Sequence, residues 1–378
     1  MELLTEYDVA IIGGGLAGLS TSIQLSRQGH SVVLFEKEAY PFHKVCGEYI
    51  GLESWSFLEG LGVRLRELDL PIIKQLFLTA PNGKTFSTQL PLGGFGISRY
   101  LLDHSLAQLA IDSGVHLLQR TKVDNVSFDN NFNIHFNGQA MTATVCCSAH
   151  GKRSNLDIKW DRDFLKQSGT RLNNYVGIKY HVKMDGDKNI IGLHNFKNGY
   201  CGISKIEEDK YCLCYMTKAE NLKKYNGNIQ QMQEAVLYQN PHLKKLFLES
   251  EFLENFPVTI SQISFSSKTK VENGILLLGD AAGMITPLCG NGMSIALHTG
   301  KIAAGLIHSF LKNEMTRKQL EIEYQNQWHN LFAKRLRTGR LLQSFFGNTT
   351  LSNLFVNSFK AFPFLAKPLI KQTHGQPF

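Results

Sequence analysis

A segment near the N-terminus constrains the fold of this 378-residue chain more than any other part of the sequence. Residues 7–12 form a short apolar run rich in β-branched side chains, as in a buried strand, and glycines crowd residues 13–18 directly after it. Residues 16–28 have the apolar spacing of a helix, and residues 30–35 read as a second buried strand that ends at Glu36. A strand, a glycine turn, a helix, a strand and an acid in this order predict a dinucleotide-binding unit.

Each part of this unit has a role toward a dinucleotide. Gly13 permits the tight turn, Gly15 lets the backbone approach a pyrophosphate, and Gly18 lets the helix pack closely on the strand. The helix start offers unpaired N–H groups and a partial positive charge to the phosphates. Glu36 can accept hydrogen bonds from both ribose hydroxyls, and an acid at this place disfavours a 2′-phosphate. We therefore expect a dinucleotide other than NADP in this slot.

A second element far downstream favours FAD over NAD. Residues 274–278 read as a buried strand that leads into Gly279-Asp280, and residues 294–311 read as a helix that follows Gly290 and Gly292. An Asp at a strand end can bind a sugar-like hydroxyl, and a glycine-lined helix start can face a flat ring. The ribityl chain and isoalloxazine ring of a flavin need such an element, whereas a simple NAD dehydrogenase does not.

These motifs resemble those of the flavoprotein monooxygenase and geranylgeranyl reductase superfamily, whose FAD domain is of the glutathione-reductase type found in aromatic hydroxylases. The resemblance covers most of the first 310 residues. It rests on the 13–18 fingerprint with Glu36, on the segment 279–292 with Asp280 and Pro287, and on the segment 147–154, which is similar to the family's Ala-Asp-Gly-x-x-Ser. His150 stands where the family has an Asp, so His150 either contacts a phosphate or marks a different use of the reductant.

The resemblance implies a set of cofactor contacts. Asp280 would bind the ribityl chain, and the helix that starts near Gly292 would aim its positive end at the flavin, where it stabilises the charge of the reduced ring. The loop with Cys46-Gly47 would pass beside the isoalloxazine, Arg99 would reach the FAD, and the backbone of Val123 would pair with the adenine. The full set of expected FAD contacts is Gly13, Gly15, Leu16, Ala17, Gly18, Glu36, Lys37, Cys46, Gly47, Arg99, Val123, Asp280, Gly292 and Met293.

Two residues of the same loop, Cys46 and Glu48, are the candidate catalytic residues. Cys46 is either a redox or proton-transfer residue or a buried packing cysteine. The other side chains that could meet a substrate lie on predicted strands and are Tyr180, His181, Tyr200 and Cys201. On a strand, such a side chain more often has a structural role than a contact with a substrate.

The fold expected from these elements is α/β: a Rossmann-like FAD domain with an inserted β-sheet substrate domain and C-terminal helices. The FAD domain comprises residues 1–70, 96–160 and 270–311, the substrate domain 71–95 and 161–269, and the helical segment 312–378. Within the substrate domain, the sequence predicts a hairpin that turns at Asn82-Gly83. Four further strands are predicted at residues 175–184, 190–194, 200–206 and 210–217.

The C-terminal segment holds most of the chain's net charge of +8, since residues 312–371 contain ten basic and three acidic side chains. The segment from Tyr324 onward is also rich in phenylalanine. It is either a helical cap with a basic solvated face or a surface that meets anionic lipid headgroups or a membrane-resident substrate. Nucleic acid is not an expected partner, because no nucleic-acid module accompanies the charge.

Other sequence features bear on compartment and metals. No run of 18 apolar residues occurs, and the first residues lack the basic region of a signal peptide. The seven cysteines include no CxxC pair, which favours neither a disulfide framework nor a metal site. We expect a cytoplasmic protein without a metal, peripheral to a membrane if the basic segment binds lipid.

The function that these observations favour is an FAD-dependent monooxygenase of a hydrophobic or phenolic small molecule. No second dinucleotide fingerprint occurs, so NAD(P)H would visit the flavin only transiently as the reductant. The first alternative is a reductase of double bonds in a prenyl or polyene chain, with Cys46 or Glu48 as proton donor. A flavin halogenase is the third possibility, and a flavin-binding protein without turnover is the fourth.

Overall fold

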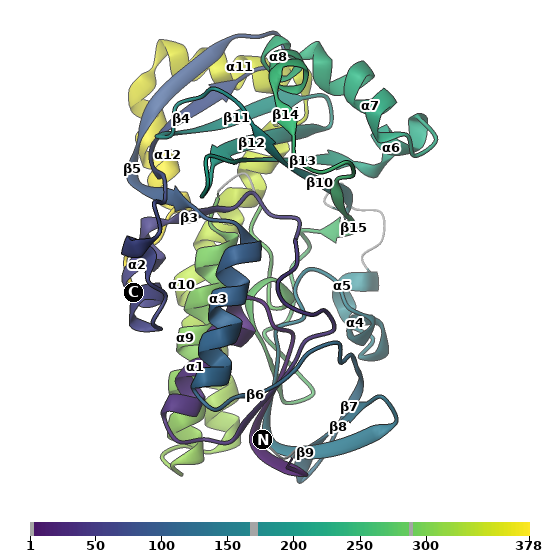
Figure 1. Ribbon diagram of the computed structural model, residues 1–378, viewed down its shortest axis with the longest axis vertical. Helices are drawn as coiled ribbons and strands as arrows, with labels where there is room; N and C mark the ends of the chain where they lie inside the picture. The colour runs from purple at the N-terminus through teal and green to yellow at the C-terminus, as the bar shows by residue number, and fades with distance from the viewer. Residues whose placement is uncertain (1–3, 167–172, 287–289) are drawn as a thin grey trace.

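The chain folds into two β-sheets stacked end to end, with long helices running along them (Figure 1). The computed structural model describes residues 4–166, 173–286 and 290–378. This is the α/β fold that the sequence predicts, with helices following the second sheet at the C-terminus. The predicted contact segment around Pro287 lies outside the described residues.

The first sheet contains the parallel strands of the dinucleotide unit. Its strand order is β16-β17-β9-β1-β2-β6, with β7 and β8 attached as an antiparallel meander to β9. Its elements are β1 (Glu6–Ile12), α1 (Leu16–Arg27), β2 (Val32–Phe35), α3 (Arg99–Asp112), β6 (His116–Leu118), β7 (Val123–Asp129), β8 (Asn131–Phe136), β9 (Gln139–Ser148), α4 (Asn155–Lys159), α5 (Asp163–Lys166), β16 (Val271–Glu272), β17 (Ile275–Leu277) and α9 (Gly292–Leu311).

The glycine turn between β1 and α1 forms as predicted. Gly13 has φ of +103°, a conformation that side-chain-bearing residues rarely adopt. A Cβ atom on Gly18 would lie 2.0 Å from the carbonyl oxygen of Gly13, so only glycine lets α1 pack this closely against the turn. Parallel pairing of β1 with β2 and β9 then places the start of α1 at the carboxyl edge of the sheet, where α/β proteins bind ligands.

The second sheet has the order β14-β10-β13-β12-β11-β4-β5-β3, with β15 paired to β10. Its elements are β3 (Tyr49–Gly51), α2 (Trp55–Gly60), β4 (Ile72–Thr79), β5 (Thr85–Gly96), β10 (Asn173–Lys183), β11 (Ile190–Phe196), β12 (Gly199–Lys205), β13 (Tyr211–Lys218), α6 (Ala219–Lys224), α7 (Ile229–Val236), α8 (Pro241–Glu249), β14 (Glu251–Phe252) and β15 (Val258–Ser264). The hairpin at Asn82-Gly83 and the four later strands match the prediction to within a few residues. The residues before position 71 also contribute to this sheet, because β3 pairs with β5.

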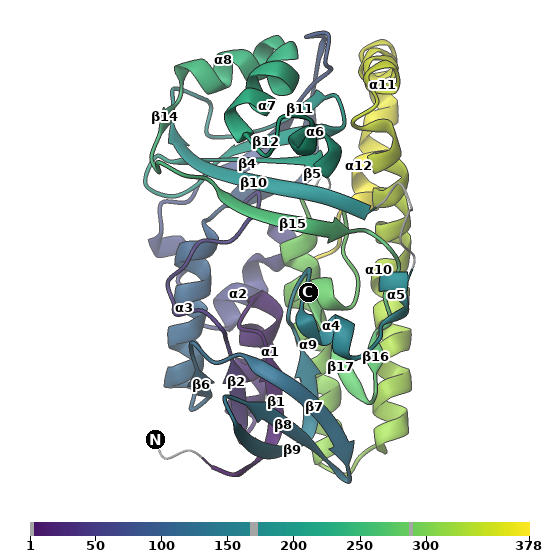
Figure 2. The same cartoon turned by 90° about the vertical axis from the view of Figure 1, so that its right-hand side faces the viewer.

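The C-terminal residues form α10 (Arg317–Phe345), α11 (Thr349–Ala361) and α12 (Ala366–Thr373). Figure 2 shows α10 running beside both sheets, while α11 and α12 lie against the second sheet. The buried apolar side chains of this segment include Leu320, Tyr324, Trp328, Phe332, Leu336, Leu342, Phe346, Val356, Phe359 and Ala366. The expected helical cap is therefore present. Among the described residues, no helix combines the length and apolar character needed to cross a bilayer.

Candidate functional site

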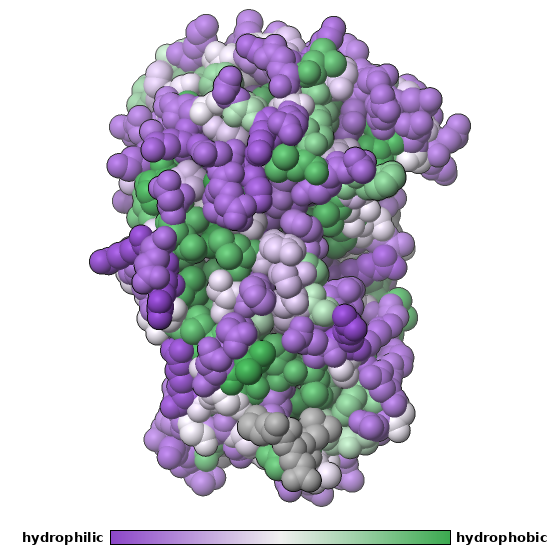
Figure 3. All heavy atoms as spheres, in the orientation of Figure 1, coloured by the Kyte–Doolittle hydropathy of each residue, from purple (hydrophilic) through white to green (hydrophobic). Residues whose placement is uncertain are grey.

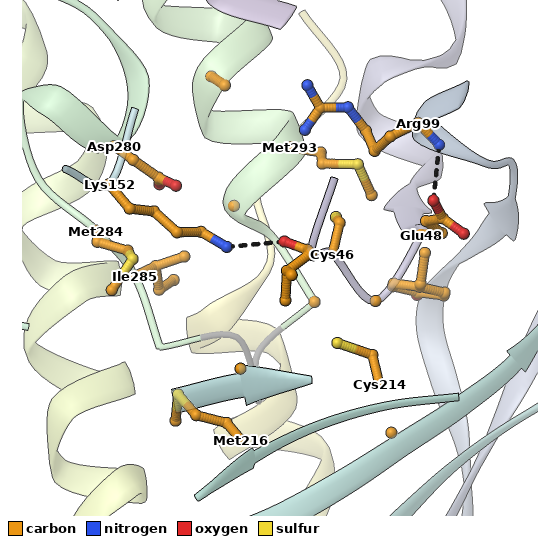
Figure 4. Close-up of a pocket in the computed structure, with 18 of the residues that line it drawn as sticks. Cys46, Glu48, Arg99, Lys152, Cys214, Met216, Asp280, Met284, Ile285 and Met293 are labelled. Atoms are coloured by element: carbon orange, nitrogen blue, oxygen red, sulfur yellow. Dashed lines mark hydrogen bonds between the residues drawn. The ribbon is translucent and has the colours of Figure 1, made fainter. Parts of the chain in front are cut away.

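A central cavity lies between the two sheets and collects most of the predicted site residues (Figure 4). It is lined by the start of α1, the loop 45–49, the segment after β9, one face of β12 and β13, and the start of α9. The predicted residues that line it are Gly15, Leu16, Ala17, Cys46, Gly47, Glu48, Arg99, Asp280, Gly292 and Met293. Segments more than 200 residues apart in the sequence thus meet at one site.

The remaining predicted cofactor residues lie outside this lining. Glu36 accepts the N–H of Gly14 at 2.9 Å, so its carboxylate holds the glycine turn. Lys37 is largely exposed and faces Glu38 at 3.9 Å. Val123 is buried at the first position of β7. Their roles toward the ribose and the adenine stay predictions.

The open space and the backbone donors at the cavity fit a flavin dinucleotide. A Cβ atom added to Gly15 would have only the guanidinium of Arg99 within 4 Å, at 3.8 Å. A Cβ atom added to Gly47 would have no atom of the described residues within 4 Å, its neighbours in the chain aside. The first turns of α1 and α9 contain no acidic residue, and their N-cap residues make no side-chain capping bond. Two helix N-termini therefore present free N–H groups and partial positive charge to one cavity, which suits a pyrophosphate at one end and a reduced flavin ring at the other.

A buried ion pair fixes Arg99 at the edge of the cavity. Ser98 caps α3, and the Arg99 guanidinium donates to both oxygens of Asp103 at 2.7 Å. Lys44 contacts the same carboxylate at 2.9 Å. Burial alone would raise the pKa of Asp103, but the charges of Arg99 and Lys44 outweigh it and lower that pKa. Asp103 thus orients Arg99.

Glu48 is the centre of a second buried cluster. Its carboxylate accepts from Lys179 Nζ at 2.7 Å, from His181 Nε2 at 2.6 Å and from the backbone N–H of Arg99 at 2.9 Å. Burial would raise the pKa of Glu48, but the hydrogen bond from His181 and the charge of Lys179 lower it to about 2. Glu48 therefore stays ionised at neutral pH, which speaks against its predicted role as a proton donor.

The Glu48 cluster ties the loop that carries Cys46 to the second sheet. His181 was a candidate substrate contact, yet its ring is engaged by Glu48 and, at 3.4 Å, by Glu254. Lys179 is not among the site residues predicted from the sequence, although a signal for it exists. A Lys and a His two positions apart on a strand share one face, and together they mark a polar spot in a sheet interior.

Cys46 keeps its candidacy because it lines the central cavity and is only partly buried. Its backbone carbonyl accepts from the thiol of Cys212 at 3.2 Å, and the carbonyl of Val45 accepts from Lys152 Nζ at 3.0 Å (Figure 4). Burial raises the pKa of the neighbouring Cys214 thiol to about 12. Of the other candidates, Tyr200 lines the cavity, and Cys201 is buried in a hydrophobic core that β10 to β13 form with α7 and α8. The Tyr180 hydroxyl accepts from Gln233 of α7.

Both ring nitrogens of His150 contact protein side chains. Its Nε2 donates to Asp157 at 3.0 Å, and its Nδ1 contacts the hydroxyl of Ser148 at 2.7 Å. Burial lowers the pKa of His150, which favours a neutral ring that donates to Asp157 and accepts from Ser148. Asp157 is also paired with Arg162 at 2.7 Å. His150 therefore belongs to a structural network, and its predicted contact with a phosphate stays a prediction.

A second cavity, which we call the tail cavity, lies next to the first. Its walls are apolar residues of β4, β5 and β11 on one side and of α10, α11 and α12 on the other. Four residues line both cavities: Tyr49, Ile191, Leu193 and Gly290. The two cavities are therefore adjacent, and their predominantly apolar linings together reach from the start of α9 to the C-terminal helices.

Comparisons with known proteins agree with this reading of the site. A family model described as FAD dependent oxidoreductase matches residues 8–44, and one described as squalene epoxidase matches residues 191–346. The chain is 26% identical over 364 residues to conditioned medium factor receptor 1 of Dictyostelium discoideum, with 86% of this chain and 68% of that protein covered. It is 24% identical over 349 residues to a digeranylgeranylglycerophospholipid reductase of Methanococcus vannielii, with 89% and 86% covered.

Solved structures share the fold at lower identity. A flavin-dependent brominase superposes with a TM-score of 0.78 at 19% identity, covering 98% of this chain and 93% of that one. A geranylgeranyl bacteriochlorophyll reductase-like protein from Thermoplasma acidophilum superposes with a TM-score of 0.74 at 19% identity, covering 93% and 91%. Both likenesses extend over the two sheets and the C-terminal helices.

Proposed function

Because the chain belongs to the superfamily of FAD-dependent oxidoreductases that includes squalene epoxidases, geranylgeranyl reductases and flavin halogenases, we propose that it reduces a carbon–carbon double bond in a long apolar chain. The observation that carries this proposal is the tail cavity. Aliphatic and aromatic side chains line nearly all of it, and it shares four lining residues with the central cavity. A flat phenol would leave this second space empty, whereas a prenyl or polyene chain would fill it.

The residues of the chain divide the work of this reaction. The starts of α1 and α9, with Arg99 and Asp280, would hold FAD, which when bound and reduced would supply two electrons as a hydride for one carbon of the double bond. The walls of the tail cavity bind the chain and exclude water. Cys46 then donates the thiol proton to the second carbon and recovers a proton from solvent. NAD(P)H is the proposed source of the electrons.

A specific observation favours monooxygenation as the second candidate. The squalene epoxidase model matches residues 191–346, a stretch that includes cavity walls on β11, β12, β13 and α10. Oxygen insertion needs the same apolar space but no proton donor at the second carbon, so Cys46 would be dispensable for it. The sequence alone favours this reaction, and the same experiment separates the two.

The experiment uses FAD-loaded protein, chemically reduced under anaerobic conditions and mixed with geranylgeraniol in detergent. Recovery of the oxidised flavin absorbance without O2, together with a product heavier by two hydrogens, is the expected result. Recovery only with O2, and a product that carries an added oxygen, would establish the monooxygenase instead. A protein that never takes up FAD would refute both, and bound FAD that no reductant reduces would indicate a flavoprotein without turnover.

The C-terminal helices offer a route for such a substrate. Leu354, Phe362, Phe364 and Leu365 are between 46% and 69% exposed on or beside α11, and Lys360 and Lys367 lie next to them in the sequence. We propose that this surface contacts an anionic membrane, from which the apolar chain passes into the tail cavity. Sedimentation with phosphatidylglycerol vesicles, but not with phosphatidylcholine vesicles, is the expected result. Equal binding by a Phe362→Ser/Phe364→Ser variant would contradict it.

A further inference from the structure

A third cavity, separate from the two described above, lies between the segment that precedes β16 and the middle of α10. Figure 2 shows β16 next to α10. Its lining includes Lys268 and Lys270 from the first segment and His329, Arg337 and Arg340 from the helix. No aspartate or glutamate lines it. We call this space the basic cavity.

The cations of the basic cavity have no acidic partner. In the described part of the chain, no carboxylate lies within ion-pair distance of Lys268, Lys270, Arg337 or Arg340. By contrast Arg335, on the same helix, is paired with Glu53 at 2.8 Å. Asp157 and Asp280 attract Lys268 only from a greater distance. These cations are therefore not neutralised by an ion pair among the described residues.

Holding these cations together costs free energy. Lys268 is 4% exposed, and its ammonium donates to the backbone carbonyl of Asp280 at 2.9 Å. Burial lowers the pKa of Lys268 to about 8, and burial together with the charges of Arg162 and Arg340 lowers that of Lys270 to about 8. Buried charges in proteins are normally paired, so an unpaired group of this kind is expected only where a bound anion offsets the cost.

A further donor at the cavity lacks a partner. The indole Nε1 of Trp328, which lines the basic cavity, is buried and has no hydrogen-bond partner in the structure as described. Lys270 Nζ lies 4.0 Å from the centre of the same ring. Buried N–H groups in folded proteins are nearly always bonded. The unsatisfied indole is thus a second, independent indication that an acceptor binds here.

We propose that the basic cavity binds the phosphate or pyrophosphate group of a small molecule. Two arginine guanidinium groups offer planar forks of N–H donors, Lys268 and Lys270 offer ammonium groups, and Trp328 offers one more donor. Phosphate oxygens are acceptors only and carry the required charge. The site is distinct from the glycine turn, because it shares no lining residue with the central cavity.

The basic cavity lies next to the central cavity, on the side where the flavin is proposed to bind. Gly283 lines the basic cavity, while Asp280 and Met284 of the same loop line the central one. A Cβ atom on Gly283 would come within 3.0 Å of the Trp328 ring, so the loop packs tightly on the basic cavity. A phosphate bound to Lys268 would therefore sit across one loop from the ribityl-binding Asp280.

The test measures binding of inorganic pyrophosphate to the FAD-loaded protein by isothermal titration calorimetry. FAD loading keeps the glycine turn occupied, so pyrophosphate binding reports on a second site. The variant Arg337→Gln/Arg340→Gln is expected to weaken binding by about tenfold or more, the effect of losing charge-assisted hydrogen bonds. The control Lys312→Gln/Lys318→Gln removes the same charge from exposed positions just after α9 and at the start of α10 and should change the affinity by less than about twofold.

Three outcomes would overturn the proposal: no binding of pyrophosphate to the wild type, undiminished binding to the arginine variant, or equal weakening in the control. Unchanged FAD content and melting temperature show that the arginine variant is folded.

The source of the phosphate is then identified by competition of candidate ligands against bound pyrophosphate. Stronger competition by NADPH than by NADH indicates a nucleotide phosphate, and stronger competition by geranylgeranyl diphosphate than by free pyrophosphate indicates a phosphorylated prenyl chain. Equal competition by all indicates free phosphate.

Discussion

Replacing Glu48 by Gln is the sharpest test of how the site is built. The substitution keeps the shape of the side chain but leaves Lys179 and His181, which are 1% and 4% exposed, without their anion. The fall of the Glu48 pKa from its ordinary 4.5 to about 2 corresponds to roughly 3 kcal/mol. This agrees with the roughly 3–5 kcal/mol lost when one partner of a buried pair is removed. We expect the variant to lose about 3 kcal/mol of unfolding free energy at pH 7.

The pH dependence of this loss distinguishes charge from packing. Because the folded pKa of Glu48 lies below 4.5, its carboxylate stabilises the fold fully above pH 4.5, and that contribution disappears as the pH falls toward 2. The difference between wild type and variant, measured by urea unfolding at a series of pH values, should shrink in the same window. The control Glu67→Gln, at a 67% exposed side chain 3.5 Å from Arg64, should cost less than about 0.5 kcal/mol. An equally small effect at Glu48, or one independent of pH, would refute the reasoning.

Three further changes test the proposed function. Cys46→Ala should abolish double-bond reduction while leaving FAD bound, and Cys46→Ser should restore part of the turnover; unchanged turnover in the Ala variant would exclude a catalytic thiol. Asp280→Ala should weaken FAD binding by roughly tenfold to a hundredfold, read from flavin absorbance after gel filtration; stoichiometric FAD would show that Asp280 does not hold it. Leu193→Trp, at the junction of the two cavities, should abolish turnover of geranylgeraniol more than that of the short alcohol prenol, and equal losses would argue against a chain in the tail cavity.

The local parts of the fold and site could be predicted from the sequence because their causes are local. The glycine turn follows from sterics between near neighbours, such as Gly18 against the Gly13 carbonyl. The Asn82-Gly83 turn follows from the backbone conformation that glycine permits; its φ at Gly83 is +83°. The register of the strands around each turn then follows from burial of one face.

The parts that the sequence did not reveal depend on contacts between distant segments. Lys179 neutralises Glu48 across 131 positions of the chain, and no spacing rule links them. The tail cavity arises only when α11 and α12 pack on β5, so its existence could not be read from any one segment. The meander of β7 and β8 could not be predicted beyond its first residues, because exposed polar side chains dominate β7. Long-range packing that decides the environment of a side chain also decides its chemistry. Lys179 and His181 keep Glu48 ionised, which speaks against its predicted role as a proton donor.

The position of α10 to α12 has a consequence for how the protein is made. These helices are the last described parts of the chain to leave the ribosome, yet they supply one whole wall of the tail cavity. The starts of α1 and α9, which line the central cavity, both precede them in the sequence. During synthesis the cofactor site can therefore assemble before the compartment for the chain closes. A nascent chain halted after α9 would be expected to take up the yellow cofactor while exposing to water the apolar faces of β4, β5 and β11.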